Sequence, residues 1–66
     1  MVVIVNGDRH EVPEGLCVAG LLLRLGLGAA ACAVEINRAL VPKRAHESRA
    51  LEEGDRIEIV SLVGGG

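Results

Sequence analysis

The alternation of hydrophobic and polar residues at the start of the chain predicts a β-hairpin. Val2–Val5 is rich in β-branched residues, and residues 9–12 can pair back on it. Between them lies Asn6-Gly7, a pair that favours a type I′ turn because both central positions of that turn need φ > 0. Pro13 then breaks the second strand, so the hairpin ends there.

A helical period follows the hairpin. Four aliphatic residues recur at positions i, i+3, i+4 and i+7 and share one helix face: Val18, Leu21, Leu22 and Leu25. Gly26 and Gly28 end this helix, and Gly20 inside it costs about 1 kcal/mol relative to alanine. Gly20 either marks a close contact with a partner or is a tolerated weakness of the helix, and we favour the second interpretation.

Residues 26–31 formally match the dinucleotide fingerprint G-x-G-x-x-A. That motif must follow a strand and open a helix, so that the helix N-terminus meets the pyrophosphate. Here the glycines close a helix and precede a strand, and we therefore expect no nucleotide site at this loop.

Period-two alternation predicts two further strands. Residues 32–36 place Cys32, Val34 and Ile36 inward, and residues 39–41 form a short strand after an Asn-Arg turn. Pro42 ends the short strand. Residues 43–49 are polar, and we expect them to form a surface loop, with one helical turn as an alternative, before Leu51 anchors the chain.

A last strand over residues 56–62 leads directly into Val63 and three glycines. Ile57 and Ile59 take the inward parity of this strand, which leaves Val60 and Leu62 side by side on the outer face. An exposed apolar pair of this kind often marks a protein contact. The alternative is that a neighbouring strand covers the pair, or that isolated exposed aliphatics need no explanation. We favour the contact, because the pair adjoins the glycines.

Composition limits the functions that the chain can have. Half of its residues are hydrophobic and none is aromatic, so a core of Val, Leu, Ile and Ala must hold a domain near the lower size limit. Such a domain has little stability to spare for a deep catalytic pocket, and we expect no enzyme. Seven basic and nine acidic residues give a net charge of -2 without a basic stripe, which argues against nucleic acid as a partner.

The same scan finds no targeting signal, metal site or disulfide framework. The apolar start at residues 1–5 has no basic region before it, and no apolar run is long enough to span a membrane. We therefore expect a cytoplasmic protein. Cys17 and Cys32 lack CxxC spacing and should be reduced thiols, and His10 and His46 have no ligand spacing, so no metal is expected.

Hairpin, helix, strand pair and final strand make an α+β domain. One helix would cover one face of a small mixed sheet of four to five strands. A right-handed crossover lets the last strand lie beside the first, parallel to it, in the middle of the sheet. This arrangement resembles the β-grasp, or ubiquitin-like, fold.

The resemblance extends to particular residues. Val-Glu-Ile-Asn-Arg at 34–38, Leu-Val-Pro at 40–42, Gly-Asp before the last strand, and the final Val63-Gly64-Gly65-Gly66 resemble the ThiS family of sulfur carrier proteins in thiamin biosynthesis. Cys17 departs from that pattern, because a threonine is common at this helix start. The resemblance divides the chain into a β-grasp domain at residues 1–63 and a flexible glycine tail at residues 64–66.

The family resemblance implies a reaction at the end of the chain. A ThiF-type adenylyltransferase would use ATP and magnesium to adenylate the carboxylate of Gly66. A persulfide from a cysteine desulfurase route would convert it to a thiocarboxylate, and thiazole synthase ThiG would take the sulfur. The carrier itself would bind no cofactor and provide no catalytic side chain.

In this scheme Gly64 and Gly65 let the tail thread into the partner enzymes, since glycine has no side chain to obstruct it. Val60, Leu62 and Val63 would form the docking face for the partners. Two other readings remain open: the small subunit of molybdopterin synthase, and a ubiquitin-like binding module whose tail has no chemical role. A frayed tail or linker remnant is the plain alternative for the glycines themselves.

Overall fold

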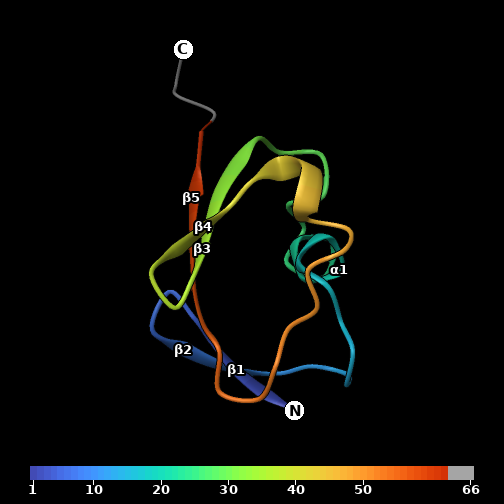
Figure 1. The fold of residues 1–66 in the computed structure, drawn as a ribbon, viewed down its shortest axis with the longest axis vertical. Coiled ribbons are helices and arrows are strands. Elements are labelled where there is room, and N and C mark those ends of the chain that lie inside the picture. Colours follow the sequence, from blue (N-terminus) through green and yellow to red (C-terminus); the bar gives the residue numbers. More distant parts are fainter. Residues whose placement is uncertain (63–66) are drawn as a thin grey trace.

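The computed structural model describes residues 1–62 and shows one five-stranded sheet with one helix packed against it (Figure 1). The strands are β1 (Val2–Val5), β2 (Asp8–Glu11), β3 (Cys32–Ile36), β4 (Ala39–Val41) and β5 (Arg56–Ser61). The helix is α1 (Val18–Arg24), and a short 3-10 helix, η1 (Lys43–Ala45), follows β4.

The sheet has the order β2-β1-β5-β3-β4, so the last strand lies at its centre. The pair β1 and β5 is parallel, and the other three pairs are antiparallel. This mixed sheet, with the last strand between the first and the third, confirms the expected β-grasp arrangement. The strand number is the upper of the two that the sequence predicted.

Two turns of this sheet have asparagine in a left-handed backbone conformation. Asn6 and Gly7 have φ values of 49° and 88° between β1 and β2, as the type I′ prediction requires. Asn37 and Arg38 have φ values of 52° and 72° between β3 and β4. Asparagine tolerates this conformation better than most residues do, because its short polar side chain can form local hydrogen bonds.

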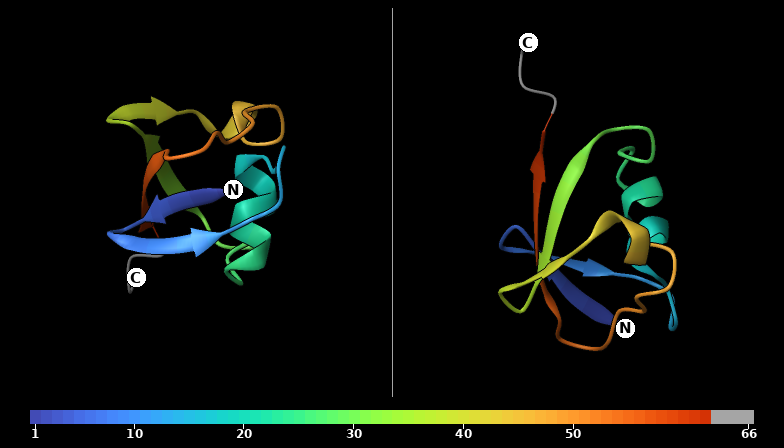
Figure 2. Two further views of the ribbon diagram at one scale, coloured as in Figure 1. Left: turned by 90° about the horizontal axis from the view of Figure 1, so that it is seen from below. Right: turned by 45° about the horizontal axis from the view of Figure 1, so that its top comes forward.

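The helix α1 covers one face of the sheet, as the two views in Figure 2 show, and the core lies between them. Its most deeply buried side chains come from the helix and from three strands: Leu21, Ile57, Val3, Val18 and Val34. Burying one such aliphatic side chain stabilises the fold by about 1.5–3 kcal/mol. The predicted helix face and the inward parity of the strands are therefore confirmed, with Leu25 only half-buried at the helix end.

The helix start uses a thiol as its N-terminal cap. Cys17 is the N-cap, and its Sγ accepts a hydrogen bond from the backbone N–H of Gly20 at 3.4 Å. Gly20 also lies against Leu16, because a Cβ built on it would come within 2.6 Å of Leu16 Cδ1. Gly20 therefore makes room for a neighbouring side chain of its own chain, which gives this glycine a packing role.

The polar stretch after β4 is packed more tightly than the sequence predicted. Lys43 and Arg44 are exposed, but His46 is only 8% exposed and its Nε2 lies 3.2 Å from the backbone oxygen of Val41. The backbone oxygen of His46 also accepts a hydrogen bond from Ala19 N–H of the helix at 2.8 Å. The expectation of a simple surface loop was wrong at His46, because this segment must close the core beside α1.

Candidate functional site

The candidate site is the end of β5, where the described part of the chain stops. β5 runs along the centre of the sheet, and its last residues lie at the opposite end of the molecule from the N-terminus (Figure 1). The predicted site residues Val63, Gly64, Gly65 and Gly66 lie outside the described residues. The structure therefore describes the strand that precedes these residues and the contacts of that strand.

Hydrogen bonds from two sides hold β5 until it reaches Leu62. On the side of β1, backbone pairing ends where Asn6 N–H donates to the oxygen of Ile57 at 2.9 Å. The Asn6 side chain continues the pairing, since its Oδ1 accepts from Ile59 N–H at 2.8 Å and its Nδ2 donates to Ile59 O at 3.1 Å. On the side of β3, Leu62 N–H donates to Ala31 O at 2.7 Å. We call the two bonds between Asn6 and Ile59 the Asn6 clamp.

A second asparagine fixes the beginning of β5. Asn37 Oδ1 accepts from Arg56 N–H at 3.0 Å, and Asn37 Nδ2 donates to Asp55 Oδ1 at 3.0 Å. Asp55 is buried, and its other oxygen accepts from Glu52 N–H at 2.8 Å. Arg49 Nη2 lies 3.9 Å from that same oxygen. A buried carboxylate needs such partners, because an unpaired buried charge is strongly destabilising.

The face of the sheet opposite α1 carries exposed aliphatic residues beside the end of β5. Val60 and Leu62 are each 59% exposed, as the sequence predicted for a docking face, and Leu40 of β4 is 67% exposed. Register places these residues on one face with Ala33, Glu35 and Glu58, because Ala33 is opposite Val60, and Glu35 is opposite both Leu40 and Glu58. We call Ala33, Glu35, Leu40, Glu58, Val60 and Leu62 the open sheet face.

Leu40 was not among the docking residues predicted from sequence. Its place on this face depends on the register between β3 and β4, which the predicted strand pair did not specify. The one available signal was its parity, since Leu40 lies between Ala39 and the buried Val41 in a short strand.

The open sheet face also carries two carboxylates directly across from each other. Glu35 and Glu58 occupy paired positions on β3 and β5, and both are exposed. Like charges in this arrangement are mildly destabilising. Arg38 and Arg56 line the same hollow on the surface, so cations lie near the pair.

Within residues 1–62 the acidic, histidine and cysteine side chains do not gather into a metal site. No group of three or more His, Cys, Asp or Glu in this range could hold a metal ion. Cys17 and Cys32 are both free thiols. None of the helices in this range has the length and apolar character needed to cross a bilayer. What this part of the chain offers is a fixed strand end beside an apolar surface.

Known proteins are similar in sequence to this chain along its whole length. The model of the ThiS family matches residues 3–66. Thiazole synthases from Paramagnetospirillum magneticum and Magnetococcus marinus are 36% and 38% identical over 66 residues, covering 100% of this chain and 20% of each of those proteins. The chain thus spans about a fifth of the length of these curated relatives.

The three-dimensional structure agrees with this match. The crystal structure of the thiamine biosynthesis protein ThiS from Geobacter metallireducens superposes with a TM-score of 0.84. Its sequence is 32% identical, and the match covers 100% of both chains. Since the family model and a solved member both match it almost from end to end, this chain belongs to the ThiS family.

Proposed function

We propose that this chain is a sulfur carrier protein of thiamin biosynthesis, and that its reactive group is the terminal carboxylate of Gly66. The observation that carries this proposal is the support of β5, which continues through the Asn6 clamp to the bond from Leu62 to Ala31. Immediately after that last bond come Val63 and three glycines. A firmly held strand followed, after Val63, by three residues without side chains suits the presentation of a chain end to an enzyme.

The proposed chemistry begins with activation of the carboxylate. A free α-carboxyl has a pKa of about 3.5, so it is an anion at neutral pH and can attack the α-phosphorus of ATP. A ThiF-type adenylyltransferase would hold the ATP and its magnesium. Pyrophosphate leaves, and the chain then carries an acyl-adenylate in place of a poor leaving group.

Sulfur enters in the next step. A persulfide sulfur, supplied by a cysteine desulfurase route, attacks the carbonyl of Gly66 and AMP leaves. Cleavage of the sulfur–sulfur bond by a second thiol releases the thiocarboxylate and leaves a disulfide on the sulfur donor. Thiazole synthase ThiG then takes the sulfur, which returns Gly66 to a carboxylate. No side chain of residues 1–62 is required to act as an acid, base or nucleophile in this scheme.

The folded part of the chain would serve as the docking module. The open sheet face adjoins Leu62, so a partner that encloses the tail meets this apolar surface at the same time. The match to part of two longer thiazole synthases supports thiazole synthase as one such partner. Linking a carrier to its enzyme raises the effective concentration of one at the other.

Intact mass spectrometry provides the direct test. The chain is incubated with ATP, magnesium, a ThiF-type adenylyltransferase and a cysteine desulfurase with its cysteine substrate. We expect the mass increase that corresponds to replacement of one oxygen by sulfur, located at Gly66 by fragmentation. A variant without Gly65 and Gly66 is the control and should remain unchanged.

Three outcomes would contradict the proposal. If the intact chain gains no sulfur while a known ThiS protein does so in the same mixture, the carrier role is wrong. If the chain supports thiazole formation equally well with its terminus blocked as an amide, the reactive group is not the Gly66 carboxylate. Co-purification with a large molybdopterin synthase subunit in place of thiazole synthase would assign the chain to the other pathway.

A further inference from the structure

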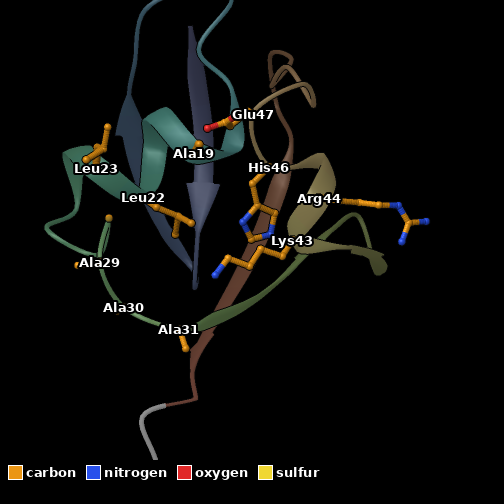
Figure 3. A pocket seen from close by; sticks show the side chains of 11 residues that line it. Ala19, Leu22, Leu23, Ala29, Ala30, Ala31, Lys43, Arg44, His46 and Glu47 are labelled. Atoms are coloured by element: carbon orange, nitrogen blue, oxygen red, sulfur yellow. The ribbon is translucent and has the colours of Figure 1, made fainter.

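A second surface feature lies on the helix side of the molecule, away from the open sheet face. It is a pocket of about 610 Å³ between α1, the segment that leads into β3, and η1 (Figure 3). Leu22, Leu23 and Ala19 of the helix line it, together with Ala31 and the buried His46. Pockets of about 300–1,000 Å³ are large enough for small ligands, so this one has room for a protruding side chain.

Leu23 is the most exposed large hydrophobic residue in the described part of the chain, at 70%. It is held against Gly28, because a Cβ built on Gly28 would come within 2.5 Å of Leu23 Cδ2. The absence of a side chain at Gly28 therefore lets Leu23 lie over this segment. Leu23 forms one wall of the pocket in this position.

The pocket is close to Leu62, the last described residue before Val63 and the glycines. Ala31 lines the pocket, and its backbone oxygen accepts the hydrogen bond from Leu62 N–H at 2.7 Å. Figure 1 shows η1 and the segment before β3 at the same end of the molecule as the end of β5. A protein that encloses the tail therefore reaches the mouth of this pocket without any change in the fold.

Two basic residues, Lys43 and Arg44, and one acidic residue, Glu47, line the pocket, so its lining carries a net positive charge although the whole chain has a net charge of -2. Lys43 extends its side chain across the pocket, whereas Arg44 points away from it (Figure 3). Glu47 is the acidic residue among those lining the pocket and lies by Ala19. The Lys43 ammonium over an apolar floor favours a group that is apolar and carries a negative charge beside it.

The composition of the chain indicates which side of the interface provides an aromatic anchor. Protein interfaces commonly depend on a few aromatic or other large residues that fill pockets on the opposite surface. This chain has no Phe, Trp or Tyr. An aromatic anchor at its interface must therefore come from the partner, and the pocket beside Lys43 is a place that can receive it.

We propose that this pocket receives a large apolar side chain, flanked by a carboxylate, from a loop of the protein that takes up the tail. This inference rests on the proposed carrier function for the identity of that protein. The loop's apolar side chain contacts Leu22, Leu23 and Ala31, and its carboxylate pairs with Lys43. The contact adds a second docking point to that of the open sheet face, on the helix side of the sheet.

A fragment titration tests the chemistry of the pocket without any partner. The full chain, labelled with nitrogen-15, is titrated by NMR with 3-phenylpropionate and separately with its neutral analogue 3-phenylpropanamide. We expect amide shifts at the pocket residues, with a dissociation constant in the millimolar range and at least threefold weaker binding of the neutral analogue. Lys43→Glu should remove the preference for the acid, while Arg44→Glu should leave it within twofold.

Partner affinity tests the same pocket in its proposed context. Lys43→Glu should lower the affinity for a ThiF-type adenylyltransferase or for thiazole synthase at least fivefold, and Leu23→Ser should do the same. Arg44→Glu makes the same charge change one residue away, and it should alter both affinities less than twofold. Both side chains at 43 and 44 are exposed, so the fold should tolerate either change.

The possible results separate this inference from the proposed function. A chain that forms the thiocarboxylate but shows no difference between Lys43→Glu and Arg44→Glu would refute the pocket and leave the carrier role intact. A chain that forms no thiocarboxylate would refute the carrier role, while the fragment titration would still decide whether the pocket has the stated preference. Shifts on the open sheet face alone, or shifts that depend on protein concentration before any fragment is added, would also refute it.

Discussion

Replacing Asn6 with glycine should loosen the end of β5 and leave the rest of the sheet in place. The side chain of Asn6 bonds to both the N–H and the oxygen of Ile59, at 2.8 Å and 3.1 Å. Glycine is the appropriate replacement, because Asn6 has a φ of 49° and glycine adopts this conformation readily. Asn6→Gly therefore removes the clamp without adding backbone strain.

The expected loss of stability follows from the two bonds. A typical intramolecular hydrogen bond contributes about 0.5–1.5 kcal/mol, so the clamp should contribute about 1–3 kcal/mol. A domain of this length is stable by about 3–10 kcal/mol in total, so the loss is a large share. Asn6→Ala should lower the free energy of unfolding by about 1–2 kcal/mol more than Asn6→Gly does, because an ordinary side chain disfavours the left-handed conformation.

Urea denaturation and hydrogen exchange measure the two parts of this prediction. The midpoint of unfolding should fall with an unchanged m-value, since the surface exposed on unfolding is nearly the same. Exchange at the Ile59 amide should accelerate more than exchange at core amides, because Ile59 N–H loses its acceptor in the folded state. Asn6→Asp keeps an acceptor for that N–H but places an oxygen against Ile59 O, and its loss should still be measurable.

Two results would refute this reasoning. If Asn6→Gly costs less than about 0.5 kcal/mol, the two hydrogen bonds contribute little beyond what water supplies. If Ile59 exchanges at the wild-type rate in that variant, the pairing of β5 with β3 alone is enough to hold the strand end. A partner affinity that is unchanged despite faster exchange would show that docking does not need a fixed tail root.

Four further changes test other parts of the structure. Leu21→Ala should lower the free energy of unfolding by about 2–5 kcal/mol in urea denaturation, because Leu21 is 1% exposed in the core. Gly20→Ala should change the free energy of unfolding by less than about 1 kcal/mol, because the better helix propensity of alanine offsets the cost of moving Leu16. The same variant should bind its partners with unchanged affinity, and a large loss of affinity would support the interpretation that Gly20 contacts a partner. Leu62→Glu should weaken partner binding in a calorimetric titration while the thermal midpoint stays near the wild-type value, and unchanged affinity would move the docking face elsewhere. Gly65→Ala should fold normally yet slow adenylation severely in a pyrophosphate-release assay, and normal adenylation would refute the need for clearance.

The helix, strands and turns of this fold could be predicted from the sequence because each has a local cause. The Asn6-Gly7 turn needs only two residues with φ > 0, and the helix face needs only the spacing of four aliphatics. The last strand was recognised by its alternation, and its buried residues Ile57 and Ile59 took the predicted parity. These features depend on residues that are near one another in the chain.

Side-chain contacts between segments far apart in the chain could not be predicted from the sequence. Asn6 was assigned to a turn, but its side chain also bonds to Ile59, 53 residues away. His46 was placed in a surface loop, yet it is buried beside Val41. Nothing in the local pattern distinguishes a solvated polar residue from one whose hydrogen-bond partner is supplied by a remote backbone.

By itself the sequence determined the order and type of the elements and the faces of helix and strands that form the core. Periodicity and turn chemistry are properties of short segments, so they survive without knowledge of the fold. Only the tertiary structure decided that the Asn6 side chain holds the end of β5 and that Lys43 comes to lie over a pocket close to Leu62. Those relations arise where segments far apart in the chain meet, and the pairing that brings them together is stabilised by the whole core at once.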